Sequence, residues 1–234
     1  ADRKPEIIIH LAAETNLETC KQNPAEAYLT NHTGTLHMAM LAYKLNIPLV
    51  YISTAGIFDG RKDAGYNEQD EPGAINHYGR SKWFGEVALM PYRYWKKWIF
   101  RAGWMMGGGP EIDKKFVNLI YKQVKAGKKE ICAVNDVFGS PTYTYDLAAT
   151  IKNVIENNAP YGVYSCGGEG VASRYDVACE VVKCLDVDVK VIPVKDGYFD
   201  KEFHCKRSKG EILDNSKLNA TGLSKMRDWH ISLK

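Results

Sequence analysis

Three short runs of nearly unbroken apolar residues constrain the fold of this chain more than any other feature. They occupy residues 6–13, 47–52 and 98–102. A strand with one face in water alternates apolar and polar residues, whereas a parallel strand covered by helices on both faces is apolar throughout. The three runs therefore predict buried strands of a parallel sheet.

Helical and strand-like segments alternate along the rest of the chain. The patterns predict helices over residues 24–45, 78–89, 114–125, 146–156 and 174–185, further strands at 130–134, 162–166 and 189–193, and an irregular tail ending near Trp229. Such alternation is typical of α/β proteins. We therefore expect a doubly wound parallel sheet.

Composition and charge narrow the class of protein. The chain has 234 residues, of which 45% are hydrophobic and 25% charged, which suits a globular protein with one substantial core. Its formal net charge of +3 is too small to argue for nucleic acid or for an acidic membrane surface. We expect neither as a partner.

The six cysteines indicate the compartment. They form no Cys-x-x-Cys pair and no zinc-like cluster with histidine. The sequence shows no secretory signal and no apolar run of about 20 residues. We therefore predict reduced thiols, a cytoplasmic location, no metal site and no membrane span.

Tyr78 and Lys82 provide the first chemical signal. They stand four residues apart near the start of a predicted helix, so their side chains share one face. A phenol has a reference pKa of about 10, and a nearby ammonium should lower that pKa. At roughly 4 Å and an effective dielectric constant of about 20, the attraction is on the order of 4 kcal/mol. The pair could thus transfer a proton, although surface pairs with this spacing are common.

Thr54 lies at the carboxyl end of the predicted strand 47–52. Ligands of open α/β sheets bind at this edge. A hydroxyl at that place can hydrogen-bond the carbonyl oxygen that Tyr78 would protonate, so the two residues predict one site.

Together with Asn31, these residues resemble the catalytic set of the extended short-chain dehydrogenase/reductases. Within that superfamily the chain is most similar to the dTDP-4-dehydrorhamnose reductases. The similar stretches follow the family's order and lie at residues 52–54, 58–60, 78–82, 100–104, 138–143 and 213–218.

The resemblance implies reduction of the C4 ketone of dTDP-4-dehydrorhamnose to dTDP-L-rhamnose by NADPH or NADH. It implies that Tyr78 donates the proton, that Lys82 lowers the pKa of Tyr78 and holds the nicotinamide ribose, and that Thr54 polarises the ketone. Asn31 would support a proton relay through a backbone carbonyl freed by a local helix distortion.

The resemblance also assigns binding residues. Ala12 and Ala13, at the end of the first predicted strand, would pass beside the cofactor. The alternative is that their small side chains only allow a helix to pack tightly on the sheet. Trp104 would contact the sugar, or would belong to the core.

One part of the expected fold is missing at the front. A Rossmann enzyme begins with a strand, a G-x-G-x-x-G turn and a helix, whereas the first glycine here is Gly34. By resemblance the sequence starts at about the fourth strand, which suggests a fragment of a longer chain with exposed apolar sheet edges. We expect residues 1–105 to form a partial NAD(P)-binding domain. Residues 106–234 would form mainly a substrate-binding lobe, interleaved with returning Rossmann elements.

Residues 55 and 56 depart from the family. An acidic residue and a tyrosine usually follow the threonine, whereas this chain has Ala55 and Gly56. Because of this departure, a first alternative is that the protein is another nucleotide-sugar epimerase or ketoreductase. Because the glycine turn is missing, a second alternative is that it is a non-catalytic regulatory subunit of the same fold. A homodimer is the default expectation for the oligomeric state.

Overall fold

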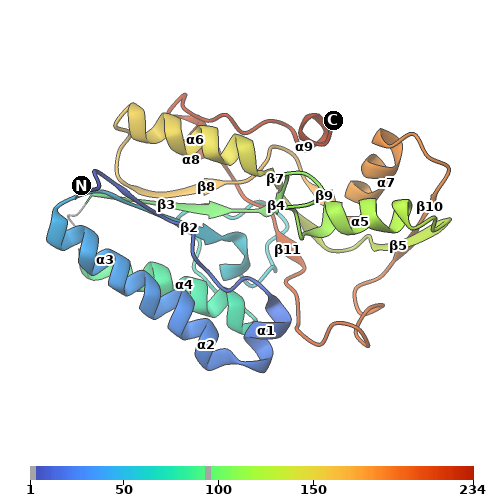
Figure 1. Ribbon diagram of the computed structural model, residues 1–234, viewed down its shortest axis with the longest axis horizontal. Helices are drawn as coiled ribbons and strands as arrows, with labels where there is room; N and C mark the ends of the chain where they lie inside the picture. The colour runs from blue at the N-terminus through green and yellow to red at the C-terminus, as the bar shows by residue number, and fades with distance from the viewer. Residues whose placement is uncertain (1–3, 93–95) are drawn as a thin grey trace.

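A parallel sheet of four strands organises the first part of the molecule (Figure 1). The structure is a computed structural model that describes residues 4–92 and 96–234. The strand order is β1-β2-β3-β8, and the strands are Ile8–His10, Leu49–Thr54, Lys97–Ala102 and Gly162–Cys166. All three pairings are parallel, which confirms the predicted α/β fold.

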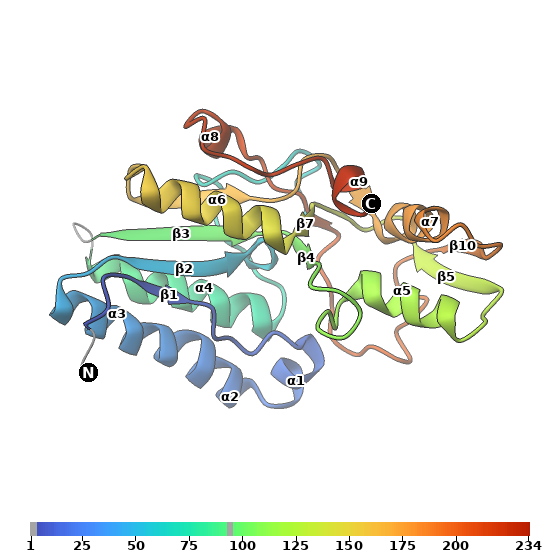
Figure 2. The same cartoon turned by 45° about the horizontal axis from the view of Figure 1, so that its top comes forward.

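Helices cover both faces of this sheet, as Figures 1 and 2 show. One face carries α2, the π-helical turn η1, α3 and α4, which span Pro24–Tyr28, Leu29–Thr33, Gly34–Leu45 and His77–Leu89. The other face carries α6 and α8, which span Thr144–Glu156 and Ser216–Asn219.

The two covered faces explain the unbroken apolar run in β2. Leu49 and Tyr51 pack into the cluster under α3 and α4. Val50 and Ile52 point the other way, into the cluster that includes residues of α6. Successive side chains of a strand point to opposite faces, so a strand buried on both sides needs apolar residues at every position.

A second lobe lies beside the carboxyl end of the sheet (Figure 1). It contains a parallel pair of strands, β5 and β10, and two helices, α5 and α7, with bounds Glu130–Val134, Lys190–Val194, Phe116–Lys125 and Arg174–Cys184. Ile120, Ile131 and Ala178 are buried in its core. The chain then leaves this lobe for α8 on the sheet and for a final short helix, α9 at Trp229–Ser232.

Short strands connect the two parts. β4 (Trp104–Met106) pairs with β7 (Pro141–Tyr143), while β6 (Phe138–Gly139) lies between β9 (Ala172–Ser173) and β11 (Gly210–Glu211). These strands were not predicted from the sequence, and neither was the capped helix α1 at Leu17–Gln22. Strands of two or three residues are too short to show a periodicity.

The first strand is shorter than predicted. Only three of its residues pair with β2, so β1 ends at His10 and the chain continues as a loop through Ala12 and Ala13. Within the described residues β1 pairs only with β2. At this edge Ile9 is 47% exposed and Leu11 is 68% exposed.

Three further observations concern cysteines, membranes and metals. The six cysteines, which all lie in the described part of the chain, are free, as predicted. Within residues 4–92 and 96–234, no helix is both long and apolar enough to cross a bilayer. The same residues bring together no group of three potential metal ligands.

Candidate active site

The start of α4 sets the position of Tyr78. Asn76 caps the helix, because its side-chain oxygen accepts a hydrogen bond of 2.9 Å from the Gly79 backbone N–H. Gly79 packs so tightly that an added Cβ would lie 2.0 Å from the Gly56 carbonyl oxygen. A glycine at position 79 thus brings the first turn of α4 against the end of β2.

Thr54 is the last residue of β2 and opens the 3₁₀ turn η2 (Ala55–Ile57). Its hydroxyl oxygen accepts a hydrogen bond of 3.0 Å from the Gly56 N–H. The Thr54 hydroxyl also lies close to the Tyr78 ring, because a Cβ atom added at Gly56 would be 3.4 Å from the hydroxyl oxygen and 3.6 Å from Cε1 of Tyr78. The structure therefore brings together the predicted hydroxyl and phenol at the carboxyl edge of the sheet.

The pKa of Tyr78 is raised in the fold, whereas the sequence predicted a lowering by Lys82, because burial has the largest effect on the phenol. Burial raises the pKa of Tyr78 to about 12, and the nearby Thr54 hydroxyl offsets only part of that rise. The Lys82 ammonium instead donates a hydrogen bond of 2.7 Å to the Ile52 carbonyl and lies 4.2 Å from the centre of the Tyr51 ring. Burial lowers the pKa of Lys82 itself to about 7.

A buried ion pair lies behind Lys82. Arg101 donates to both carboxylate oxygens of Glu86, at 3.1 and 2.8 Å, and Ser53 donates to the same carboxylate at 2.5 Å. The Glu86 charge raises the pKa of Lys82 and so opposes the effect of burial. This ion pair was not predicted, although the charged Arg101 inside the apolar strand 98–102 was a usable signal.

Asn31 lies in the π-helical turn η1, which confirms the predicted distortion of the helix. Its side chain accepts from the Glu14 N–H and donates to the Glu14 carbonyl, both at 2.9 Å, and also donates to the Ser81 hydroxyl at 2.9 Å. The Ser81 hydroxyl in turn donates to the Tyr78 carbonyl at 2.8 Å. The Asn31 carbonyl accepts the Thr35 hydroxyl at 2.7 Å, and its second lone pair can still accept another hydrogen bond.

Ala12 and Ala13 lie in the loop that leaves β1 at the same edge of the sheet as Thr54. Ala12 is exposed and Ala13 is partly buried. The two hydrogen bonds between Asn31 and Glu14 hold the next residue of this loop in place. Small side chains here allow a ligand to approach the backbone.

Trp104 in β4 joins the site through Glu211. Its indole N–H donates to a Glu211 carboxylate oxygen at 2.7 Å, and the Arg174 guanidinium carbon lies 3.6 Å from the centre of the indole ring. Burial raises the pKa of Glu211 and lowers the pKa of Arg174 to about 10. Glu211 and Arg174 were not predicted, because 107 positions separate Trp104 from Glu211 in the sequence.

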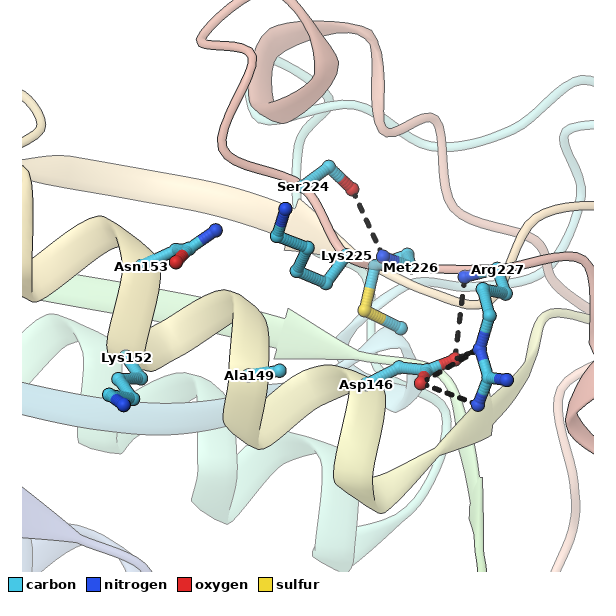
Figure 3. Close-up of a pocket in the computed structure, with 8 residues that line it drawn as sticks. All are labelled: Asp146, Ala149, Lys152, Asn153, Ser224, Lys225, Met226 and Arg227. Atoms are coloured by element: carbon cyan, nitrogen blue, oxygen red, sulfur yellow. Dashed lines mark hydrogen bonds and ion pairs between the residues drawn. The ribbon is translucent and has the colours of Figure 1, made fainter.

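A separate hollow of about 580 Å³ lies on the other side of the sheet from α4 (Figure 3). Its lining residues come from α6 and the C-terminal tail: Asp146, Ala149, Lys152, Asn153, Ser224, Lys225, Met226 and Arg227. Arg227 binds Asp146 at 2.8 Å, and this ion pair ties the tail to the start of α6. The hollow contains none of the residues around Tyr78.

Comparison with known proteins gives consistent matches. The family model described as "RmlD substrate binding domain" matches residues 1–234. A dTDP-4-dehydrorhamnose reductase from Mycobacterium tuberculosis is 30% identical over 99% of this chain and 76% of its own length.

Two solved structures are also similar. A dTDP-4-dehydrorhamnose reductase from Yersinia enterocolitica is 34% identical with a TM-score of 0.89, over 98% of this chain and 79% of its own. The Bacillus anthracis enzyme of the same name, solved in complex with NADP, is 31% identical with a TM-score of 0.90, over 98% of this chain and 79% of its own.

Proposed function

The chain belongs to the RmlD substrate binding domain family, and from this premise we propose that it reduces the C4 ketone of dTDP-4-dehydrorhamnose to dTDP-L-rhamnose with NADPH or NADH. It is an oxidoreductase that acts on a nucleotide-sugar. The observation that carries the proposal is the close approach of Thr54 and Tyr78 at the carboxyl end of β2. Lys82 follows one helical turn later.

Reduction of a ketone needs a hydride at carbon and a proton at oxygen. The nicotinamide, when bound, supplies the hydride. The Thr54 hydroxyl hydrogen-bonds the ketone oxygen, and the Tyr78 phenol gives that oxygen its proton as negative charge develops there. Because the pKa of Tyr78 is about 12, the phenol is protonated at neutral pH and can act as the acid.

The site fits the nicotinamide end of the cofactor. Lys82 offers a buried ammonium for the ribose hydroxyls, and the loop at Ala12 and Ala13 offers backbone that a flat ring can approach. Asn31 acts through Ser81, which is hydrogen-bonded to the Tyr78 backbone. No glycine precedes Gly34 in the sequence, so we assign only this end of the cofactor to these residues.

Replacement of Tyr78 tests the proposal directly. Tyr78→Phe keeps the ring and removes the proton donor, so we expect kcat to fall about 100- to 10,000-fold. Circular dichroism and the unfolding midpoint should stay close to wild type. Tyr145→Phe is the matched control, because the Tyr145 side chain is exposed on α6. Substantial turnover by Tyr78→Phe would refute the role of the phenol.

A second candidate substrate rests on Ala55 and Gly56, which replace the acidic residue and tyrosine of the resembled family. This second candidate is a different nucleotide-sugar, whose ketone would also bind at Thr54 and Tyr78. NADPH oxidation against a panel of such ketones separates the two candidates. If the full-length protein oxidises NADPH with none of these ketones, the result would favour the alternative that it is a non-catalytic regulatory subunit. The division of the chain at residue 105, the homodimer and the cytoplasmic location stay predictions.

A further inference from the structure

Three side chains with functional groups lie close to Gly56. A Cβ atom added there would lie 3.4 Å from the Thr54 hydroxyl oxygen, 3.6 Å from Cε1 of Tyr78 and 3.7 Å from Oε1 of Glu211. All three are ordinary contact distances, so alanine would fit, while a larger side chain would have to displace one of the groups. A small residue at position 56 therefore lets the Glu211 carboxylate lie beside Thr54 and Tyr78.

The two oxygens of Glu211 have different surroundings. Oε2 accepts the hydrogen bond from the Trp104 indole. Within residues 4–92 and 96–234, no group donates a hydrogen bond to Oε1, the oxygen beside Gly56. Glu211 is only partly buried, and a carboxylate oxygen is a strong acceptor, so Oε1 is open to a hydrogen-bond donor. A bound ligand can supply that donor.

The cationic surroundings favour a charged Glu211. Arg174 lies over the Trp104 ring and 5.0 Å from the centre of the Phe116 ring, and this stacking holds its position. Burial raises the pKa of Glu211, and the Trp104 hydrogen bond and the charges of Arg174 and Arg207 offset part of that rise. The carboxylate is therefore fixed by Trp104 on one side and attracted by two guanidinium groups.

We propose that Glu211 determines specificity, because its Oε1 accepts a hydrogen bond from a hydroxyl on the sugar carbon next to the ketone. The assignment rests on the proposed function, which puts the ketone oxygen at Thr54 and Tyr78. A carboxylate repels the ketone oxygen itself but attracts a neighbouring hydroxyl, so it also fixes which way the ring faces. Glu211, on β11, brings a carboxylate to a site where Ala55 and Gly56 provide none.

The test uses the full-length protein and two ligands, dTDP-L-rhamnose and its analogue lacking the hydroxyl on the carbon next to C4. Glu211→Gln keeps the shape and an acceptor for Trp104 but removes the charge. We expect the Kd of the hydroxylated sugar, measured by calorimetry, to rise about 10- to 100-fold. The Kd of the deoxy analogue should change less than about threefold. The same pattern is expected in kcat/KM for the matching ketones.

The outcomes separate this inference from the proposed function. The role of Glu211 would be overturned if Glu211→Gln changed the Kd of both sugars equally or changed neither Kd. It would also be overturned if the wild type did not bind the hydroxylated sugar more tightly than the deoxy analogue. Lack of turnover by the wild type would instead overturn the proposed reaction, while the two Kd values still decide the inference. Glu156→Gln, an exposed carboxylate on α6, is the matched control.

Discussion

Lys82 shows how burial changes the chemistry of a single residue. Its side chain is almost fully buried, its pKa is about 7, and its ammonium binds a backbone carbonyl instead of the tyrosine four residues away. The unfolded chain would protonate this amine up to about pH 10.4. The unfolded state therefore binds more protons between pH 7 and about pH 10, and the contribution of Lys82 to stability increases as the pH rises through that window.

Removal of this amine should stabilise the fold at low pH. For Lys82→Met we expect the free energy of unfolding at pH 6 to exceed that of wild type by on the order of 4 kcal/mol. The gain should decline toward pH 10. Urea unfolding at several pH values measures it, with Lys128→Met, at an exposed position, as the control. A difference that does not change with pH would contradict the lowered pKa.

Local patterns predicted only part of the site. Thr54 and Tyr78 were found because a strand end and a helix start are visible in short stretches of sequence. The raised pKa of Tyr78 could not be predicted, because desolvation depends on what surrounds the phenol in the fold. Glu211 and Arg174 carry no local signal, since only the folded chain brings them to Trp104.

Among the elements, the π-helical turn η1 interrupts the helix that the sequence predicted over residues 24–45. The weak helix formers after Asn31 indicated a distortion, and the predicted helix 24–45 is divided there into α2, η1 and α3. The turn packs on α4, where Gly85 is required: a Cβ at that position would lie 2.7 Å from the Asn31 carbonyl oxygen. The distortion thus lets two helices approach closely beside Tyr78.

Asn31→Ala should loosen both the loop after β1 and the start of α4. The substitution removes two hydrogen bonds to Glu14 and one to Ser81, so we expect a loss of about 2–3 kcal/mol in unfolding free energy. The KM for NADPH should also rise, because the loop with Ala12 and Ala13 is no longer held. Asn157→Ala, at an exposed helix end, is the control for stability and KM. An unchanged KM would show that the loop does not contact the cofactor.

At the scale of the whole molecule, the sheet and the second lobe were predicted to different extents. The strands β5 and β8 have the predicted bounds, because short apolar runs between turn residues are clear signals. The links between the lobes were not predicted: β4 with β7, and β6 with β9 and β11. These pairings are set by the packing of distant segments and not by the local sequence.

The exposed edge at β1 should make this polypeptide associate with itself. Ile9 is exposed, and within the described residues the strand has a partner on one side only. An unpaired apolar edge can add a strand from another copy. We expect Ile9→Lys to reduce the apparent mass in light scattering at high protein concentration. Ile231→Lys, an exposed residue of α9, should not. Equal masses for wild type and Ile9→Lys would exclude this edge as the contact.

The pairing of β3 with β8 also affects how the protein forms during translation. The two strands lie side by side, but about 60 residues separate the end of one from the start of the other. At the rate of translation, the fourth strand leaves the ribosome roughly 3–12 s after the third. During that interval the nascent chain carries β1, β2 and β3 with the β8 edge of the sheet open, while the first elements of the second lobe emerge. The sheet that supports Thr54 and Tyr78 is therefore completed late in synthesis.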